Sequence, residues 1–198
     1  TEEPKVMEFG EITPFEKIKN LFVTELTKFA QQKTEIHRLW NIDEQTANLL
    51  YMLIKAKRPT NILEIGTSNG YSTFWLSISA EKAKIHTIEV DEERFHLAKE
   101  NLQNRDNITQ HFGKAEEIIS TLTQKFDFIF IDAGKIGYIN YIKLIIDKLE
   151  NGAIIVADNV ISHKNSVQDY LDFIKNNENF ETATIEIGDG LEISIFQK

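Results

Sequence analysis

The sequence predicts an α/β protein built on an open, mostly parallel β-sheet, and three features support this fold class. Apolar runs rich in β-branched residues alternate with amphipathic helical stretches through most of the chain, which is typical of βαβ units. The stretch Asn61–Thr73 reads as a buried strand that runs into a glycine turn and a helix. The last two apolar runs are joined by Gly188-Asp189-Gly190 without a helix, so we expect them to pair antiparallel.

Two helices are expected before the first strand, at about residues 15–29 and 43–57. The second ends before Pro59 and carries apolar residues on one stripe: Ala47, Leu50, Tyr51 and Ile54. After residue 73, strands and helices alternate in four pairs: 84–89 and 92–103, 108–112 and 115–123, 126–131 and 138–149, 153–157 and 166–176. The two terminal strands are expected at 182–187 and 192–196.

The length and composition are those of one globular domain. The chain has 198 residues, of which 41% are hydrophobic, and this is enough for a core between packed layers. No linker rich in Pro, Gly or Ser marks a domain boundary. We therefore predict a single domain over residues 1–198, with residues 1–58 as an N-terminal helical segment packed on it.

Charge and cysteine content exclude several classes of protein. The formal net charge of −9, without a run of Lys or Arg, disfavours bulk binding to nucleic acid or to an anionic membrane. The absence of Cys excludes a disulfide framework, a zinc ribbon and a thiol nucleophile. The N-terminus lacks the pattern of a secretory signal, and no apolar run approaches the roughly 18 residues of a membrane span. We expect a soluble, cytoplasmic protein.

The glycine turn after the first strand predicts the kind of ligand. Gly66 and Gly70 are spaced G-x-x-x-G, whereas a dinucleotide fingerprint needs G-x-G-x-x-G, and a P-loop needs a Lys after its last Gly. Neither a pyrophosphate cradle nor a P-loop is therefore set up. Glu64 places a carboxylate beside the turn, which suits a cationic ligand better than a phosphate.

Acidic residues stand where several strands end, and ligands collect at the carboxyl ends of strands in open parallel sheets. Glu89 lies 19 residues after Gly70, near the spacing at which an acid accepts both hydroxyls of a ribose. An adenosine-type ligand is therefore indicated. The alternative is that Glu89 is a solvated charge attracted by the N-terminus of the following helix.

Three oxygen donors follow two neighbouring strands: Asp132 after one, and Asp158 and Asn159 after the next. This set suits a Mg²⁺-like ion that keeps water ligands and takes others from a substrate. The alternative is that both Asp residues cap the helices that follow. Lys135 stands close enough to reach the same site, and a Lys whose pKa is depressed beside a cation can act as general base.

Aromatic and His residues give weaker signals. Tyr138 and Tyr141 share one helical face and can line a cofactor or pack on the sheet. His163 follows the Asp158-Asn159 pair and can line a substrate entrance. The other His residues share no metal-ligand spacing: His37, His86, His96 and His111.

The ordered set of motifs resembles the catechol and caffeoyl-CoA O-methyltransferases, small cation-dependent enzymes that use S-adenosylmethionine, and their bacterial members above all. The resemblance runs over about residues 40–198. The matching pieces are Leu63-Glu-Ile-Gly-Thr-Ser-Asn-Gly-Tyr-Ser-Thr73, Thr87-Ile-Glu-Val-Asp91, Phe130-Ile-Asp-Ala-Gly-Lys135 with Tyr138 and Tyr141, Ala157-Asp-Asn159, and Ile187-Gly-Asp-Gly-Leu191.

The resemblance implies a Rossmann-like doubly wound sheet of seven strands in the order 3-2-1-4-5-7-6, with strand 7 antiparallel. It implies S-adenosylmethionine as cofactor, held through its methionine part at the glycine turn, its ribose at Glu89 and its adenine at Ala115. The implied cofactor-binding residues are Ile42, Glu64, Gly66, Thr67, Ser68, Gly70, Ser72, Glu89, Ala115, Asp132 and Tyr141. The implied metal ligands, for Mg²⁺ or alternatively Ca²⁺ or Mn²⁺, are Asp132, Asp158 and Asn159, with Lys135 as the catalytic residue.

The chain departs from the family pattern at two places. Gly134 stands where relatives carry Asp or another polar residue, which loosens the loop that positions Lys135. The residues after Asn159 lack a Trp that is frequent in the family, so substrate contacts do not transfer.

These motifs predict O-methyl transfer to a small, catechol-like acceptor by a homodimer that forms through the N-terminal helices. One alternative is methylation of a hydroxylated tRNA uridine, supported by a possible basic patch and disfavoured by net charge: Lys28, Lys33, Arg38, Lys55, Lys57 and Arg58. The other alternative is a non-catalytic cofactor-binding module.

Overall fold

The structure is a computed structural model that describes residues 13–35 and 39–198. The chain divides into two compact units, Thr1–His37 and Arg38–Lys198, and each is described by itself. Among the described residues, no helix has both the length and the apolar character that a bilayer span requires.

In its described residues 13–35, the N-terminal unit contains two helices where the sequence predicted one. These are α1 (Pro14–Leu21) and α2 (Val23–Glu35). Thr13 caps α1 by accepting a hydrogen bond from the Glu16 N–H at 3.2 Å. At Phe22 the chain leaves the helical region, and the Phe22 N–H bonds the Lys19 carbonyl instead of continuing the α-helical pattern. The prediction of one continuous helix was therefore wrong. The break has no signal in the sequence, because neither Gly nor Pro stands at Phe22.

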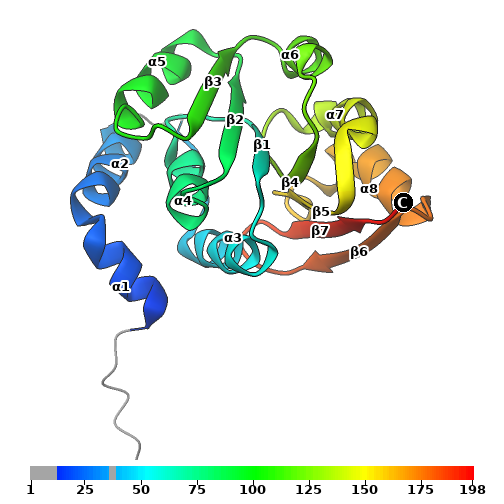
Figure 1. Cartoon of the computed structure of the whole chain (residues 1–198), viewed down its shortest axis with the longest axis horizontal. Helices are drawn as coiled ribbons and strands as arrows, with labels where there is room; N and C mark the ends of the chain where they lie inside the picture. The colour runs from blue at the N-terminus through cyan, green and yellow to red at the C-terminus, as the bar shows by residue number, and fades with distance from the viewer. Residues whose placement is uncertain (1–12, 36–38) are drawn as a thin grey trace, which may run out of the picture. The chain divides into compact units, whose positions relative to one another are not determined.

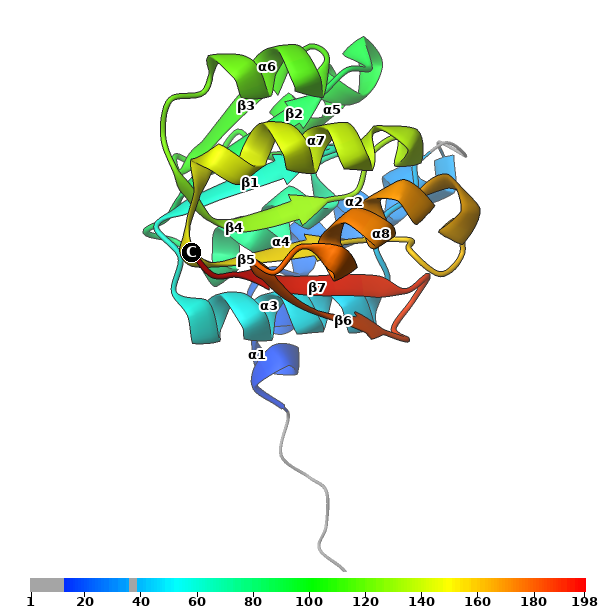
Figure 2. The same cartoon turned by 90° about the vertical axis from the view of Figure 1, so that its right-hand side faces the viewer.

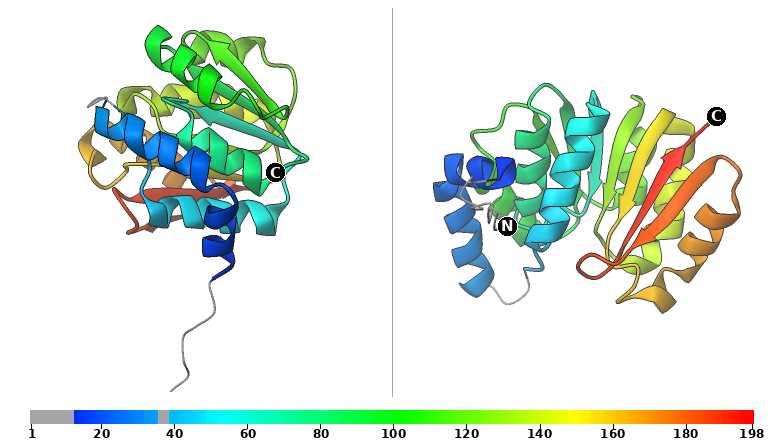
Figure 3. Two further views of the ribbon diagram at one scale, coloured as in Figure 1. Left: turned by 90° about the vertical axis from the view of Figure 1, so that its left-hand side faces the viewer. Right: turned by 90° about the horizontal axis from the view of Figure 1, so that it is seen from below.

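The second unit is a seven-stranded sheet whose order is β3-β2-β1-β4-β5-β7-β6. All neighbours pair in parallel except β7, which is antiparallel to both β5 and β6. The predicted strand order and the antiparallel end are confirmed, and β6 lies at the outer edge (Figure 3, right). The strands are β1 (Asn61–Ile65), β2 (Lys84–Glu89), β3 (Ile108–Phe112), β4 (Phe126–Ile131), β5 (Leu149–Ala157), β6 (Phe180–Ile185) and β7 (Leu191–Phe196).

Helices cover both faces of the sheet, with α3, α4 and α5 on one side and α6, α7 and α8 on the other (Figures 1 and 2). Because the central strands are covered on both faces, β1 and β4 are almost continuously apolar. The helices are α3 (Glu44–Lys57), α4 (Tyr71–Ser79), α5 (Glu92–Asn101), α6 (Ala115–Thr121), α7 (Tyr138–Ile145) and α8 (Gln168–Asn176), with 3₁₀ turns η1 (Lys135–Gly137), η2 (Ile146–Lys148) and η3 (Lys164–Ser166).

Three predicted elements have different boundaries in the structure, for identifiable reasons. Strand β5 begins at Leu149, because Leu149 pairs with Phe126 before a register shift in the β4–β5 ladder. The predicted helix 138–149 therefore ends early, at Ile145 and η2. Strand β6 lies two residues earlier than expected, since Phe180 pairs with Phe196 at the far end of the hairpin.

Backbone hydrogen bonds align the residues that follow the central strands. The Gly66 N–H bonds the Ile88 carbonyl at 3.0 Å, and the Asp132 N–H bonds the Ile65 carbonyl at 2.9 Å. The Asp158 N–H continues the series to the Ile131 carbonyl at 2.9 Å. The first residues after β1, β4 and β5 therefore lie side by side at one edge of the sheet.

Gly66 is the position where this edge is tightest. Its φ is +101°, in the left-handed region, and a Cβ added there would lie 2.0 Å from the Asp132 carbonyl oxygen. The glycine turn after β1 thus packs directly against the backbone that follows β4. Only a residue without a side chain fits this contact.

We expect Gly66→Ala to lower the free energy of unfolding by about 2–4 kcal/mol, since it combines a disfavoured φ with a backbone clash. Gly134→Ala is the matched control, because Gly134 has a φ of −59° and a Cβ there meets no heavy atom of the described chain within 4 Å. Chemical denaturation measures both variants. Equal losses would show that the Gly66 contact is not tight in solution.

Candidate active site

A buried carboxylate organises the turn after β1. Glu64 is fully buried and accepts hydrogen bonds from the hydroxyls of Ser72 at 2.6 Å, Thr87 at 2.6 Å and Thr73. Because Thr87 donates its only proton to Glu64, the neighbouring Thr67 hydroxyl at 2.6 Å donates to Thr87. One network of hydroxyls and a carboxylate therefore joins β1, β2 and the start of α4.

The electrostatic state of Glu64 follows from this burial. Burial raises the pKa of Glu64 from 4.5 to about 7, the three hydroxyls oppose the rise, and the negative charge of Asp132 adds to it. The sequence predicted a negative charge beside the turn for a cationic ligand. The structure places the carboxylate beneath the turn with its own donors, and direct contact with a ligand stays a prediction.

Glu89 closes β2 at the rim of the site. One carboxylate oxygen accepts from the N–H groups of Val90 and Asp91, both at 2.9 Å, and the other accepts from the Ser68 N–H at 2.7 Å. An ionised carboxylate has about four lone-pair sites, so capacity for a ligand hydroxyl remains. Glu89 thereby also fixes the glycine turn against β2.

The glycine turn has two features that suit a ligand. The Ser68 hydroxyl is buried without a hydrogen-bond partner in the described chain, and Ser68 has a φ of +50°. Helix α4 begins at Gly70, which offers no side-chain cap for the N–H groups of the first turn. Such a helix start accepts a carboxylate or another anionic group from a ligand.

The remaining predicted cofactor residues lie on elements that reach the same edge. Ile42 directly precedes Asp43, the N-cap of α3. A Cβ added at Gly188 would lie 2.1 Å from an Asp43 carboxylate oxygen, so the start of α3 touches the turn between β6 and β7. This contact brings Ile42 near the β6–β7 turn, whose Asp189 bonds Asn159 after β5.

Ala115 and Tyr141 lie on the other side of the rim. Ala115 is the buried first residue of α6, and the nearby Gly113 N–H bonds the Glu89 carbonyl at 2.9 Å. Burial raises the pKa of Tyr141, and the negative charge of Glu116 raises it further, which places the phenol near the first turn of α6. The start of α6 is thus close to the end of β2, and the Tyr141 hydroxyl lies against Gly137, where an added Cβ would come within 2.4 Å of it.

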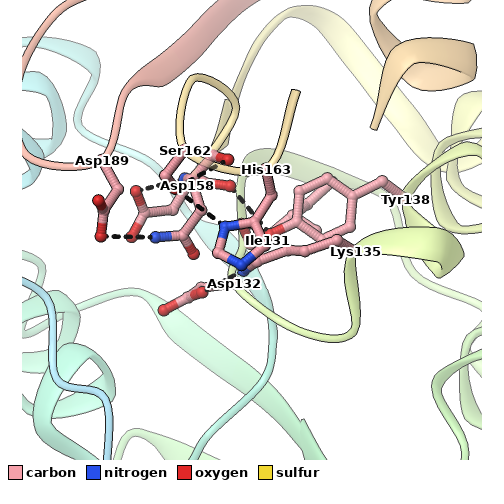
Figure 4. A network of polar contacts seen from close by, with 9 residues as sticks. Ile131, Asp132, Lys135, Tyr138, Asp158, Ser162, His163 and Asp189 are labelled. Carbon is pink, nitrogen blue, oxygen red and sulfur yellow. Dashed lines mark hydrogen bonds and ion pairs between the residues drawn. The ribbon is translucent and has the colours of Figure 1, made fainter. Parts of the chain in front are cut away.

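The predicted metal ligands lie at the ends of β4 and β5 (Figure 4). Asp158 is 5% exposed and accepts the Asn159 N–H at 2.6 Å. Its pKa is raised to about 7, first by burial and then by the negative charge of Asp132. Asn159 has a φ of +62°, and its amide nitrogen donates to Asp189 at 3.3 Å, so its amide oxygen remains an acceptor.

The donor set consists of two carboxylates and an amide. Within residues 13–35 and 39–198, no group of three or more His, Cys, Asp or Glu side chains is placed to hold a metal. The negative charge of Asp132 nonetheless adds to the raised pKa of Asp158, and a divalent cation would offset that effect. Three hard oxygen atoms with room for water suit Mg²⁺ or Mn²⁺.

Lys135 lies in the same cluster. Its ammonium contacts an Asp132 carboxylate oxygen at 2.8 Å and the Tyr138 hydroxyl at 3.0 Å. The Lys135 side chain is 16% exposed and that of Asp132 is 21% exposed, so this pair is only partly screened by water. The structure therefore brings Lys135 to the metal ligands despite Gly134.

Three residues with evident roles were not assigned by sequence reasoning. Asp189 reaches Asn159 from a turn thirty positions away in the chain, as its hydrogen bond shows. Thr87 supports Glu64 from the neighbouring strand, and Tyr138 holds Lys135 and is fully buried. All three lie in the motifs of the resemblance, and Tyr138 stands three positions after Lys135. The partners of Thr87 and Asp189, however, depend on strand order and register.

Other polar groups lie away from this cluster. His86 Nδ1 lies 2.9 Å from His111 Nε2, because β2 and β3 pair in parallel and bring the two rings together. A hollow of about 470 Å³ beside them is lined by Asn61 and Lys84, which begin β1 and β2. It therefore opens at the amino ends of the strands, opposite the acids.

The basic residues of the second unit that were considered for RNA binding also lie away from the acids. Lys55, Lys57 and Arg58 stand at the end of α3, just before β1 begins, and thus at the amino edge of the sheet. Arg38 lies outside the described residues, and of Lys33 only the backbone is described.

An open sheet with a glycine turn after its first strand and acids at its carboxyl edge defines an α/β protein of the class that binds nucleotide-type cofactors. A family model described as O-methyltransferase matches residues 15–195, and the chain belongs to this family.

Individual relatives agree with this assignment. A catechol O-methyltransferase of Mycobacterium tuberculosis is 34% identical over 137 residues, which are 67% of this chain and 62% of that enzyme. The chain thus spans less than two thirds of that relative's length. The structure of cofactor-bound Rv0187 from MTB has a TM-score of 0.81 at 25% identity and covers 95% of this chain and 99% of its own. TomG from Streptomyces achromogenes, an O-methyltransferase solved with S-adenosylmethionine, has a TM-score of 0.81 at 23% identity and covers 94% and 100%.

The buried Glu64 predicts a specific dependence of stability on pH. Because its pKa is higher in the folded state, its contribution to stability is fully present below pH 4.5 and is lost as the pH rises through about 7. Between pH 5 and pH 8, we expect the wild-type protein to lose about 2–3 kcal/mol of unfolding free energy relative to Glu64→Gln, which stays neutral.

Urea denaturation of both proteins at several pH values measures this difference. Glu100→Gln is the control, since Glu100 is exposed on α5 and its replacement removes the same charge. Parallel pH profiles for the wild type and Glu64→Gln would contradict the account.

Proposed function

We propose that the protein transfers the methyl group of S-adenosylmethionine to a hydroxyl of a small, catechol-like acceptor, with a divalent cation held by Asp132, Asp158 and Asn159. The observation that carries this proposal is the backbone contact between Gly66 and Asp132, which sets the glycine turn directly beside the acid pair. A cofactor at the turn and a cation at the acids would then be neighbours.

Features of the turn support the cofactor. The buried, unpartnered Ser68 hydroxyl and the start of α4 at Gly70 suit the polar methionine end, and the free acceptor capacity of Glu89 suits a ribose. The family match and the solved relative with S-adenosylmethionine support the same ligand. Net negative charge at the edge favours a sulfonium cation over a phosphate.

The chemistry divides between the bound groups and the side chains. S-adenosylmethionine supplies an electrophilic methyl group, and a divalent cation lowers the pKa of a hydroxyl bound to it. Asp132 and Asp158 hold negative charge in a partly buried site, and this orients a cation and acceptor relative to the turn. The named relative that acts on catechol supports an acceptor with two adjacent oxygens.

Lys135 is the general base that takes the proton from the acceptor's hydroxyl. Its amine lies at the acid pair, 2.8 Å from Asp132, where a hydroxyl bound next to Asp132 and Asp158 would be within reach. As a neutral amine, Lys135 Nζ accepts the acceptor's hydroxyl proton; as an ammonium, it then neutralises Asp132. The deprotonated oxygen would then bond to the methyl carbon in line as the S–CH₃ bond breaks, and neutral S-adenosylhomocysteine would leave.

Asp158→Asn tests the metal assignment. We expect turnover in Mg²⁺ to fall by at least about 100-fold, because one of two charged ligands is lost, while the affinity for S-adenosylmethionine changes less than about threefold. Calorimetric titration with the cofactor, with and without Mg²⁺ and a catechol, measures each binding step and turnover in the same samples. Asp169→Asn, which removes an exposed carboxylate on α8, is the control.

Loss of cofactor affinity and turnover to the same degree in Asp158→Asn would show that Asp158 is structural. The proposed activity would be contradicted if the wild type binds the cofactor but, in Mg²⁺, methylates no catechol-like acceptor. That result would favour the non-catalytic cofactor-binding module.

A further inference from the structure

We propose that Tyr138 is a positioning residue for Lys135: its buried hydroxyl holds the Lys135 amine so that a single direction remains open for the acceptor's proton. The inference rests on the proposed function, in which Lys135 takes that proton. The sequence left two roles open for Tyr138, lining the cofactor or packing on the sheet, and this inference gives it a role in the reaction.

The Tyr138 hydroxyl joins three parts of the site. It accepts a hydrogen bond from Lys135 Nζ at 3.0 Å and lies 3.1 Å from both the Ile131 and the Asp158 carbonyl oxygens. Ile131 ends β4 and Asp158 follows β5, so one phenol links the lysine to both strand ends that carry the acids (Figure 4).

The direction of these hydrogen bonds is fixed by chemistry. Carbonyl oxygens only accept, so the single phenolic proton is committed to Ile131 or Asp158. The phenol oxygen can therefore only accept from Lys135. Burial, followed by the negative charges of Asp132 and Asp158, raises the pKa of Tyr138, so the phenol keeps its proton.

Lys135 Nζ has three positions beyond its carbon atom. One points to Asp132 at 2.8 Å and one to Tyr138 at 3.0 Å. Because Asp132 and Tyr138 occupy two of the three positions, only the third remains to face the acceptor's hydroxyl. A general base acts efficiently only when its lone pair faces the proton, which is the geometry that these two bonds select.

The phenol is itself rigidly held, unlike the loop before it. The Tyr138 ring is fully buried and packs edge-on against Tyr170 on α8, with centroids 5.8 Å apart. Gly134 offers no side chain that can hold Lys135, and its surroundings are open. Tyr138, at the start of α7, supplies from the far side of η1 the support that the loop lacks.

The test is a double-mutant cycle with Tyr138→Phe and Lys135→Met, assayed with S-adenosylmethionine, Mg²⁺ and catechol. We expect Tyr138→Phe to lower kcat about 10- to 100-fold, with the acceptor KM and cofactor affinity within about twofold of wild type. In the Lys135→Met background, Tyr138→Phe should cause no further loss of kcat. Tyr170→Phe is the matched control, because it removes an equally buried hydroxyl from the ring that packs on Tyr138.

An equal loss of kcat in both backgrounds, or a loss of cofactor affinity, would overturn the positioning role. The unfolding midpoints of the wild type, the two single variants and the double variant test the contact without turnover. We expect the double variant's midpoint to shift by less than the sum of the two single shifts. Additive shifts would overturn the inference. If the midpoints are non-additive but the wild type methylates no acceptor, the proposed function is wrong and the contact between Tyr138 and Lys135 is still supported.

Discussion

The candidate site depends on one steric constraint, the contact between the Gly66 backbone and the Asp132 carbonyl. Parallel strands place their carboxyl ends at the same edge, but they do not by themselves bring the glycine turn into contact with the strand end that carries Asp132. The absence of a side chain at Gly66 allows this approach, and the hydrogen bond from Asp132 to Ile65 fixes its register. The proximity of the two proposed subsites is thus a property of the backbone.

Around this contact the protein concentrates negative charge that the fold disfavours. Burial raises the pKa values of both Glu64 and Asp158 to about 7, so ionising either one costs stability. Lys135 offsets part of this cost by pairing with Asp132. A site that holds unfavourable negative charge is suited to bind a cation, and both a sulfonium and a divalent metal fit that requirement.

Hydrophobic periodicity was sufficient to predict the alternating strands and helices, and the ordered motifs predicted the strand order. The break at Phe22 could not be predicted, because no Gly or Pro causes it. Interactions across strands were also inaccessible: Thr87 meets Glu64, and Asp189 meets Asn159, through pairings that a linear pattern does not encode. The sequence predicted which residues carry the chemistry, whereas the structure shows which side chains and backbone groups hold those residues in place.

The most direct measurement is a crystal structure with S-adenosylhomocysteine and Mn²⁺, in which anomalous scattering locates the metal. The account predicts an Mn²⁺ peak within bonding distance of Asp132, Asp158 and Asn159, with the ligand's amino acid end in the turn from Gly66 to Gly70 beside it. Metal bound elsewhere, or a ligand seated away from that turn, would contradict the central claim.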